Sequence, residues 1–272
     1  MSAADLPTAR SGRTAVEVAR QAAQAAAGIM LATYRTGIEK TTKRRGDFLT
    51  QADLACEKVA LDLLADEYPA VPVLSEETSA EVADWRSGWL WVIDPIDGTS
   101  NFARGTPTFA FNIAFCRDGE PVLGVTLQPV TGDEWVAVEG AGLTVNGAPT
   151  RVSEAASLED ALTGFGLGYK YDRSKLMLGI LHDLWPGILH AQNIGSAALG
   201  LAYAASGRFD LYVHSYLFPW DMAAGIVQVR EAGGLVLDRA GEPVTIYSEG
   251  LAAGAPGPVR DFVAATKDRP WR

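Results

Sequence analysis

The sequence contains little cysteine and little histidine, and this scarcity argues against several classes of protein. Two cysteines (Cys56 and Cys116) and three histidines (His182, His190 and His214) occur among 272 residues. The cysteines are not spaced like metal ligands, so we expect neither a disulfide framework nor a zinc finger. The histidines form no H-E-x-x-H pattern, which disfavours a zinc site built on imidazoles.

Long apolar runs and positive charge are also scarce. No stretch approaches the roughly 20 apolar residues needed to cross a bilayer, and residues 1–10 (MSAADLPTAR) lack the apolar core of a signal peptide. We therefore expect no membrane partner and a cytoplasmic location. The formal net charge of −10 would repel nucleic acid phosphates, which disfavours a nucleic acid partner. A phosphorylated small substrate fits this charge only where bound cations reverse the local field.

What the sequence does contain is an alternation of helical and extended patterns. Hydrophobic residues make up 48% and charged residues 21%, as in folded proteins with a large core. Apolar periodicity predicts helices over 14–34 and 51–67, and Asn146-Gly147 predicts a hairpin turn. The strands predicted in this first part are 71–74, 90–93, 109–116, 122–127 and 135–138.

Beyond residue 150 the alternation becomes regular. The predicted strands are 161–165, 189–193, 209–213 and 234–237. The predicted helices are 174–184, 196–205 and 222–232. Such alternation indicates an α/β (α+β) fold of layered helices and sheets. We place a boundary near residue 150, between an N-terminal α+β half (1–150) and a C-terminal α/β half (151–272).

The most informative segment is 91–102, WVIDPIDGTSNF. An apolar strand leads into Asp94, and Asp97 follows three residues later. Pro95 stiffens the link between them, while Gly98 permits a tight turn. Two carboxylates at a strand end can converge on one point, and the amides that follow can face a phosphate oxygen. A helix N-cap explains one aspartate, not two that flank a proline, so we assign this segment a functional role.

Other acidic residues extend this pattern. Glu76 and Glu77 follow a predicted strand, whereas Asp53 and Asp221 stand where helices begin. Taken singly, each is explained equally well by a solvated turn or an N-cap. Carboxylate and carbonyl oxygens are, however, the ligands that Mg²⁺ prefers. A cluster of such groups without cations would suffer strong like-charge repulsion.

These motifs resemble those of the inositol monophosphatase family, within the wider group of Li⁺-sensitive, Mg²⁺-dependent phosphatases. The similarity covers nearly the whole chain. The family pattern W-x-I-D-P-I-D-G-T-x-N-F is similar to 91–102, and W-D-x-A-A-G to 220–225. The D-x-x-T-x-x-D element is similar to 47–53, the E-E pair to 76–77, and G-S-A-A to 195–198. Order and spacing agree for all five motifs.

The resemblance implies a layered αβαβα sandwich that generally forms a homodimer. It implies that Glu76, Asp94 and the Ile96 carbonyl bind one Mg²⁺ ion. Asp94, Asp97 and Asp221 would bind a second, and Glu76 with water would hold a weaker third. On this assignment the N-terminal half carries most of the metal ligands, while the C-terminal half supplies Asp221 and the residues around the substrate.

The resemblance also implies the catalytic roles. Thr99 would lie beside the attacking water, Asp53 would support Thr99, and Glu76 would help to orient the water. The implied substrate-binding residues are Asp97, Gly98, Thr99, Gly195, Ser196, Ala197 and His214. The expected reaction is hydrolysis of a phosphomonoester by in-line attack of a metal-activated water. No histidine or cysteine occurs in the matching motifs to act as a nucleophile instead.

Several alternatives stay open at this stage. The basic segment 40–47 is either a solvated loop or a mobile lid. Gln192 stands where the family often has arginine, at the dimer contact or the substrate rim. The polar and aromatic stretch 169–173 could meet the leaving group or form a surface loop.

The substrate is open as well. Inositol monophosphatases carry a glutamate at the position of His214, and an imidazole accepts fewer hydrogen bonds than a carboxylate, which weakens the case for inositol. Histidinol phosphate, fructose 1,6-bisphosphate and 3′-phosphoadenosine nucleotides remain as alternatives. A non-catalytic phosphate-binding protein is a remote further possibility.

Overall fold

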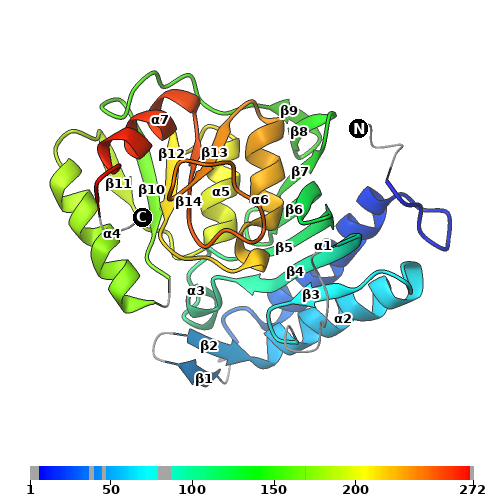
Figure 1. The fold of residues 1–272 in the computed structure, drawn as a ribbon. Coiled ribbons are helices and arrows are strands. Elements are labelled where there is room, and N and C mark those ends of the chain that lie inside the picture. Colours follow the sequence, from blue (N-terminus) through cyan, green and yellow to red (C-terminus); the bar gives the residue numbers. More distant parts are fainter. Residues whose placement is uncertain (1–5, 37–39, 45–46, 79–86, 169, 270–272) are drawn as a thin grey trace.

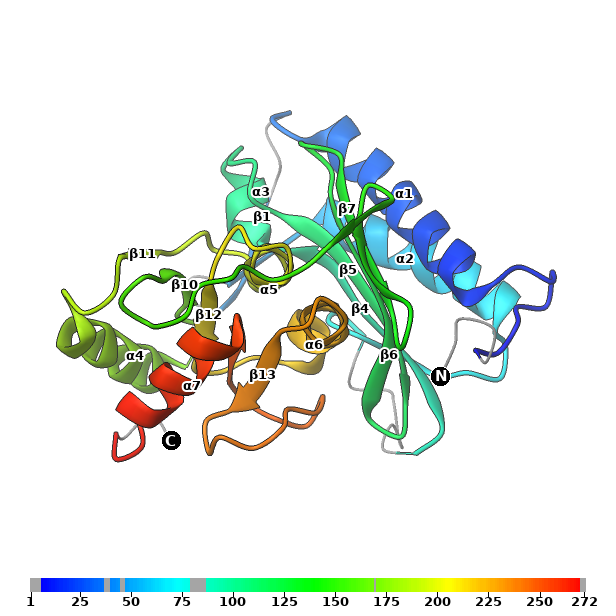
Figure 2. The ribbon, with the colours of Figure 1, turned by 90° about the horizontal axis from the view of Figure 1, so that it is seen from above.

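The computed structural model describes residues 6–36, 40–44, 47–78, 87–168 and 170–269. These residues form five layers in the order helix, sheet, helix, sheet, helix, as Figure 2 shows from above and Figure 1 from the side. Among the described residues, no helix is both long enough and apolar enough to span a membrane.

The first layer consists of α1 (Ala15–Thr33) and α2 (Gln51–Glu67). Each begins with a capping box, in which Thr14 pairs with Glu17 and Thr50 pairs with Asp53. The alanine-rich face of α1 and one face of α2 pack on the same side of the large sheet. The predicted bounds of both helices are confirmed to within one residue.

The large sheet has the strand order β3-β4-β5-β6-β7-β8-β9. All neighbours are antiparallel except the parallel pair β3–β4. The predicted turn at Asn146-Gly147 joins β8 to β9, with both residues at positive φ. The strands are β3 (Val73–Ser75), β4 (Trp89–Asp97), β5 (Ala110–Arg117), β6 (Glu120–Gln128), β7 (Asp133–Val138), β8 (Gly142–Val145) and β9 (Ala148–Thr150).

The middle and outer helix layers enclose the smaller sheet. Helices α5 (Ala197–Ala205) and α6 (Pro219–Glu231) lie between the two sheets, and α4 (Tyr171–Leu184) and α7 (Pro256–Ala265) cover the outer face. The smaller sheet has the order β11-β10-β12-β14-β13. Its strands are β10 (Leu162–Gly166), β11 (His190–Gln192), β12 (Leu211–His214), β13 (Leu235–Asp238) and β14 (Leu251–Gly254).

The predicted αβαβα sandwich is confirmed, and most elements lie within a few residues of their predicted bounds. Strand β14 and helix α7 were missed, because Leu-Ala-Ala-Gly is a weak strand pattern and Pro-Gly-Pro resembles a turn. The two sheets divide along the chain after residue 150, where β9 ends. Whether this division also separates two domains stays a prediction.

The structure corrects two predictions. The strand predicted over 90–93 continues to Asp97, with an irregular register against β5 between Asp94 and Asp97. The segment 40–47, expected to be a loop, contributes its described residues to a hairpin of β1 (Lys40–Arg44) and β2 (Asp47–Thr50). Threonines in β1 favour extended backbone and outweigh the charge pattern. The role of this segment as a lid stays a prediction.

Candidate active site

Asp94 and Asp97 come from the end of β4, in the interior of the molecule. They are only 2% and 5% exposed. After Asp97 the chain turns at Gly98, whose φ of 91° lies in the left-handed region, and continues into the short helix α3 (Thr99–Ala103). A Cβ atom at residue 98 would stand 2.9 Å from the Thr108 carbonyl oxygen, so glycine is required both for conformation and for space.

Asp221 comes from the first turn of α6, on the other side of the site. Sequence reasoning expected it just before the helix, but α6 begins earlier, at Pro219. Proline suits this first helical position because its missing N–H has no partner there. The Asp221 carboxylate accepts a hydrogen bond from the Phe218 amide at 2.7 Å, and this bond holds the carboxylate against the start of α6.

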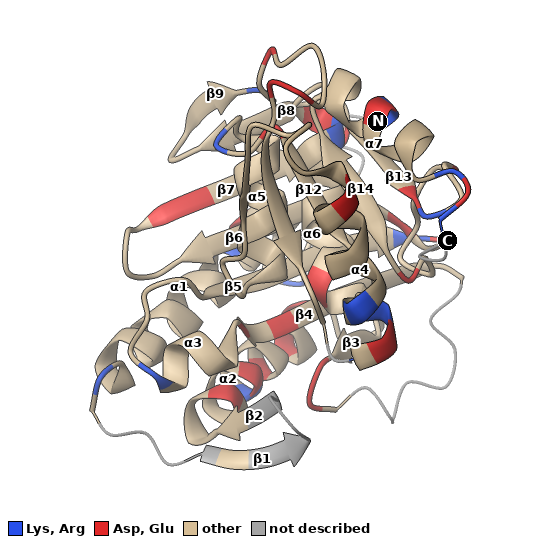
Figure 3. Ribbon diagram, turned by 90° about the vertical axis from the view of Figure 1, so that its left-hand side faces the viewer, with Lys and Arg blue, Asp and Glu red and all other residues tan. Residues whose placement is uncertain are grey.

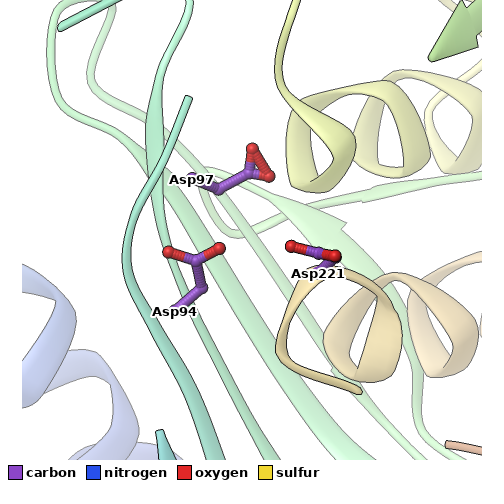
Figure 4. Close-up of side chains that lie close together, drawn as sticks. All are labelled: Asp94, Asp97 and Asp221. Atoms are coloured by element: carbon purple, nitrogen blue, oxygen red, sulfur yellow. The ribbon is translucent and has the colours of Figure 1, made fainter. Parts of the chain in front are cut away.

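The three carboxylates converge. One ligand oxygen from each of Asp94, Asp97 and Asp221 lies within 4.8 Å of the others, and Figure 4 shows the carboxylates directed toward a common space. Figure 3 shows acidic segments on β4 and on α2 as well. Asp94, Asp97 and Asp221 line a cavity of about 240 Å³. The other predicted site residues that line it are Glu76, Ile96, Gly98, Thr99, Gly195, Ser196, Ala197 and His214.

Asp94 is the least satisfied member of the cluster. Its Oδ1 atom is buried and has no hydrogen-bond partner among the residues that the structure describes. Burial, and then the charges of Glu76, Asp97 and Asp221, hold the pKa of Asp94 well above its ordinary value. A buried carboxylate in this position must take up a proton or meet a cation. The donors available are oxygens, which fit a hard divalent cation such as Mg²⁺.

Asp97 is held very differently. Its two oxygens accept hydrogen bonds from the amides of Ala197 at 2.9 Å and Ala198 at 2.7 Å, at the start of α5. Burial raises the pKa of Asp97 to about 6, and these hydrogen bonds oppose the rise. The negative charge is therefore stabilised by the N-terminal end of a helix. Figure 4 shows the Asp97 carboxylate directed toward that helix.

Thr99 and Asp53 form the predicted pair. The Thr99 hydroxyl lies 3.1 Å from Asp53 Oδ1 and 2.9 Å from the Ile96 carbonyl oxygen, so its single hydrogen serves one or both acceptors. The Thr50 hydroxyl and amide donate to the other oxygen of Asp53 at 2.6 Å and 2.7 Å. Burial raises the pKa of Asp53 to about 6. Asp53 thus contacts the site through the Thr99 hydroxyl, and its charge also contributes to the raised pKa of Asp94.

Glu76 lies at the edge of this arrangement. It lines the cavity and its charge raises the pKa of Asp94. It is not one of the three carboxylates that lie within 4.8 Å of one another. The Glu76 amide donates to the Ile93 carbonyl at 3.3 Å, which fixes its backbone beside β4.

His214 forms part of the opposite wall, at the end of β12. Its Nδ1 accepts a hydrogen bond from the Tyr216 amide at 3.3 Å, which places the ring hydrogen on Nε2. Burial lowers the pKa of His214 to about 3, so the ring is neutral at physiological pH. Gly166 and Gly168 pack against the ring so closely that a Cβ on either would stand within 3 Å of it.

The remaining candidate positions do not line the cavity, and some residues that do line it were not predicted. Gln192 is exposed on β11 and does not line the cavity, while Tyr169 lies outside the described residues. Lys170 places its Nζ 3.5 Å above the ring of Tyr216, a cavity residue that sequence reasoning did not select. Tyr216 and Phe218 carried one signal, an aromatic residue at every second position up to Trp220.

Known proteins resemble this chain in sequence and in fold. The Nus factor SuhB of Escherichia coli K12 is 34% identical over 256 residues, which cover 93% of this chain and 96% of that protein. A fructose-1,6-bisphosphatase/inositol-1-monophosphatase of Thermotoga maritima is 34% identical over 224 residues, covering 82% and 84% of the two chains. The crystal structure of the extragenic suppressor protein suhB from Bartonella henselae superposes with a TM-score of 0.84 at 31% identity, covering 93% and 98%.

The model of the inositol monophosphatase family matches residues 12–268 of this chain. This match spans both sheets and every predicted motif. Together with the relatives, it supports phosphatase activity. The chain belongs to the inositol monophosphatase family.

Proposed function

We propose that this chain is a Mg²⁺-dependent phosphomonoesterase that hydrolyses a small phosphorylated metabolite. The observation that carries the proposal is the convergence of Asp94, Asp97 and Asp221 to within 4.8 Å in a buried cavity. The orphaned Oδ1 of Asp94 supports it, because a bound cation would satisfy that atom.

Two or three Mg²⁺ ions would be held mainly by oxygens of this chain. Asp94, with Glu76 and the Ile96 carbonyl, would form one site, and Asp94 with Asp97 and Asp221 a second. Glu76 with water would form a weaker third. When bound, the ions would offset the acidic charge, polarise the phosphoryl oxygens and activate water for in-line attack.

The chain's own residues would bind and orient the reactants. The amides of Gly98 and Thr99, at the start of α3, would hold the phosphate. The Thr99 hydroxyl would accept a hydrogen bond from the attacking water, while it donates to Asp53 or to the Ile96 carbonyl. Glu76 would orient the same water. Gly195, Ser196 and Ala197 would form the edge of the substrate site at the start of α5.

His214 points to leaving groups other than inositol. Its ring is neutral and its Nδ1 already accepts from the Tyr216 amide, so it would offer inositol hydroxyl hydrogens no acceptor of the kind that a carboxylate supplies. This weakens the case for inositol and keeps histidinol phosphate, fructose 1,6-bisphosphate or a 3′-phosphoadenosine nucleotide as the second candidate class. The reaction at phosphorus would be the same for all of them.

We further propose a cytoplasmic homodimer with no membrane or nucleic acid partner. Three large apolar side chains around α4 and β11 support self-association, since Leu178, Trp185 and Leu189 are 49%, 56% and 64% exposed. The formal net charge of −10 supports the absence of a nucleic acid partner.

A panel of phosphorylated metabolites tests the function. We expect phosphate release in Mg²⁺, loss of release in excess EDTA and inhibition by Li⁺. Comparison of kcat/KM across inositol phosphate, histidinol phosphate, fructose 1,6-bisphosphate and a 3′-phosphoadenosine nucleotide would identify the leaving group. Release that continues undiminished in EDTA would contradict the proposal.

A non-catalytic role is the remaining candidate. The observation that favours it is the name of a relative, a Nus factor, which does not refer to a reaction. Absence of phosphate release from every member of the panel, by protein that is folded and binds Mg²⁺, would support this role.

A further inference from the structure

Asn112 connects the two sides of the acidic cluster. It lies on β5 directly opposite Asp94 of β4, and neighbours in register share one face of a sheet. Its side chain is almost fully buried. The Asn112 Nδ2 atom donates a hydrogen bond to the Trp220 carbonyl at 2.8 Å. Trp220 immediately precedes Asp221, so one side chain joins the strand that neighbours Asp94 to the turn that carries Asp221.

Two further buried side chains fix the orientation of the Asn112 amide. The Thr126 hydroxyl donates to Asn112 Oδ1 at 2.7 Å, and Thr126 in turn accepts from Gln228 Nε2 at 2.9 Å. Because the Trp220 carbonyl can only accept a hydrogen bond, the nitrogen of the Asn112 amide must face it. The amide oxygen therefore faces Thr126, whose hydroxyl donates to it. The three side chains form a directional series from Gln228 to the Trp220 carbonyl.

The same series ties α6 to the large sheet at two points. Gln228 lies on α6 seven residues after Asp221, about two helical turns away. Between these points α6 lies directly on β6, since a Cβ at Gly124 would stand 2.6 Å from the Ala224 carbonyl oxygen. The helix can therefore neither slide along the sheet nor lift from it without breaking a buried hydrogen bond.

We propose that Asn112, held by Thr126 and Gln228, is a positioning residue that sets the separation of Asp94 and Asp221. This inference rests on the proposed metal-binding function. None of the three side chains lines the cavity. Asn112 acts through the Trp220 carbonyl, and so determines whether carboxylates from two layers of the fold stand at the spacing a shared cation needs.

The test compares two amide-to-leucine substitutions in the large sheet. Asn112→Leu removes the bond to the Trp220 carbonyl. Gln128→Leu is the matched control, because Gln128 is buried on β6, donates to the Pro107 carbonyl at 3.1 Å and accepts from the Tyr203 hydroxyl at 3.1 Å. Both variants lose one amide–carbonyl bond and leave one hydroxyl without its acceptor, but only Asn112 is joined to the residue before Asp221.

The readouts are Mg²⁺ affinity by calorimetry and stability in urea with EDTA, neither of which depends on turnover. We expect Asn112→Leu to weaken Mg²⁺ binding about 10- to 100-fold, the usual effect of losing a group that orients metal ligands. Gln128→Leu should lose similar stability yet bind Mg²⁺ within about twofold of the wild type. Equal effects of the two variants on affinity, or no effect of Asn112→Leu, would overturn the inference.

A second pair decides the matter if Asn112→Leu does not fold. Thr126→Val removes the donor that orients the Asn112 amide and should weaken Mg²⁺ binding. Thr126→Ser keeps the hydroxyl and should retain the Mg²⁺ affinity of the wild type. Identical Mg²⁺ affinities for the two would overturn the inference. A wild-type protein that binds no Mg²⁺ would overturn the proposed function as well, so failure of the two proposals is distinguishable.

Discussion

The end of β4 and the start of α5 contribute to the site in opposite ways. The β4 end supplies Asp94 and Asp97, both buried within four residues of chain. The α5 start supplies amide donors that bind Asp97, while the α6 start supplies the third carboxylate, Asp221. The large sheet thus concentrates negative charge, and the second half of the chain supplies part of its compensation. The site exists only where the two sheets are packed around the middle helices.

The two aspartates of β4 also differ from each other in their hydrogen bonding. Asp97 has both oxygens bound by amides of α5, whereas Asp94 has a buried oxygen with no partner among the described residues. These hydrogen bonds offset part of the cost of burying the Asp97 charge even without metal ions. Asp94 lacks such compensation, and under the proposed function a bound cation would supply it. Substitution of each aspartate separates these two contributions.

The largest effect is expected from Asp94→Asn. Loss of the charge should lower phosphate release by more than about 100-fold, since the residue would serve both main cation sites. The metal-free protein should become more stable, by roughly 0.5–2 kcal/mol, because like-charge repulsion is removed. Phosphate-release assays and urea unfolding in EDTA measure the two effects. Unchanged turnover, or a less stable metal-free protein, would contradict the role assigned to Asp94.

Asp97→Asn should lower kcat greatly as well, but with the opposite effect on stability. The asparagine side chain has one acceptor oxygen, so its NH₂ group would face an amide donor of Ala197 or Ala198. We expect a loss of roughly 1–3 kcal/mol in the unfolding free energy of the metal-free protein. Urea unfolding of Asp94→Asn and Asp97→Asn in parallel tests the contrast. If both variants shift stability in the same direction, the distinction between the two aspartates is wrong.

Sequence reasoning reached the parts of the site that are encoded locally. The pattern of an apolar strand followed by Asp94, Asp97 and Gly98 predicts a turn with converging carboxylates, and the structure has this turn. The apolar periodicity of α1 and α2 is equally local, which is why their bounds were predicted closely. The resemblance to a family supplied Asp221, Glu76 and Asp53, whose local patterns were ambiguous.

The parts that sequence reasoning missed depend on contacts between distant segments. Asn112 lies within an apolar strand pattern, and its partners Thr126 and Trp220 are 14 and 108 residues away along the chain. The neutral state of His214 follows from burial against Gly166 and Gly168, which the packing of β10 and β12 creates. Pairings of this kind leave no periodic signal in a single sequence.

The smallest expected effect is the pH dependence of the metal-free protein. Burial raises the pKa of Asp53 and of Asp97 from 3.8 to about 6. A carboxyl whose folded pKa exceeds its unfolded value binds its proton more tightly in the folded state. The stability it contributes is therefore fully present below pH 3.8 and is lost as the pH rises through about 6. Between about pH 5 and pH 7 we expect the unfolding free energy in EDTA to fall by on the order of 1 kcal/mol per group, and the urea midpoint to fall with it. In saturating Mg²⁺ the trend should flatten or reverse, because the cations stabilise the ionised carboxylates. A midpoint in EDTA that rises over this range would show that the acidic cluster does not destabilise the metal-free fold.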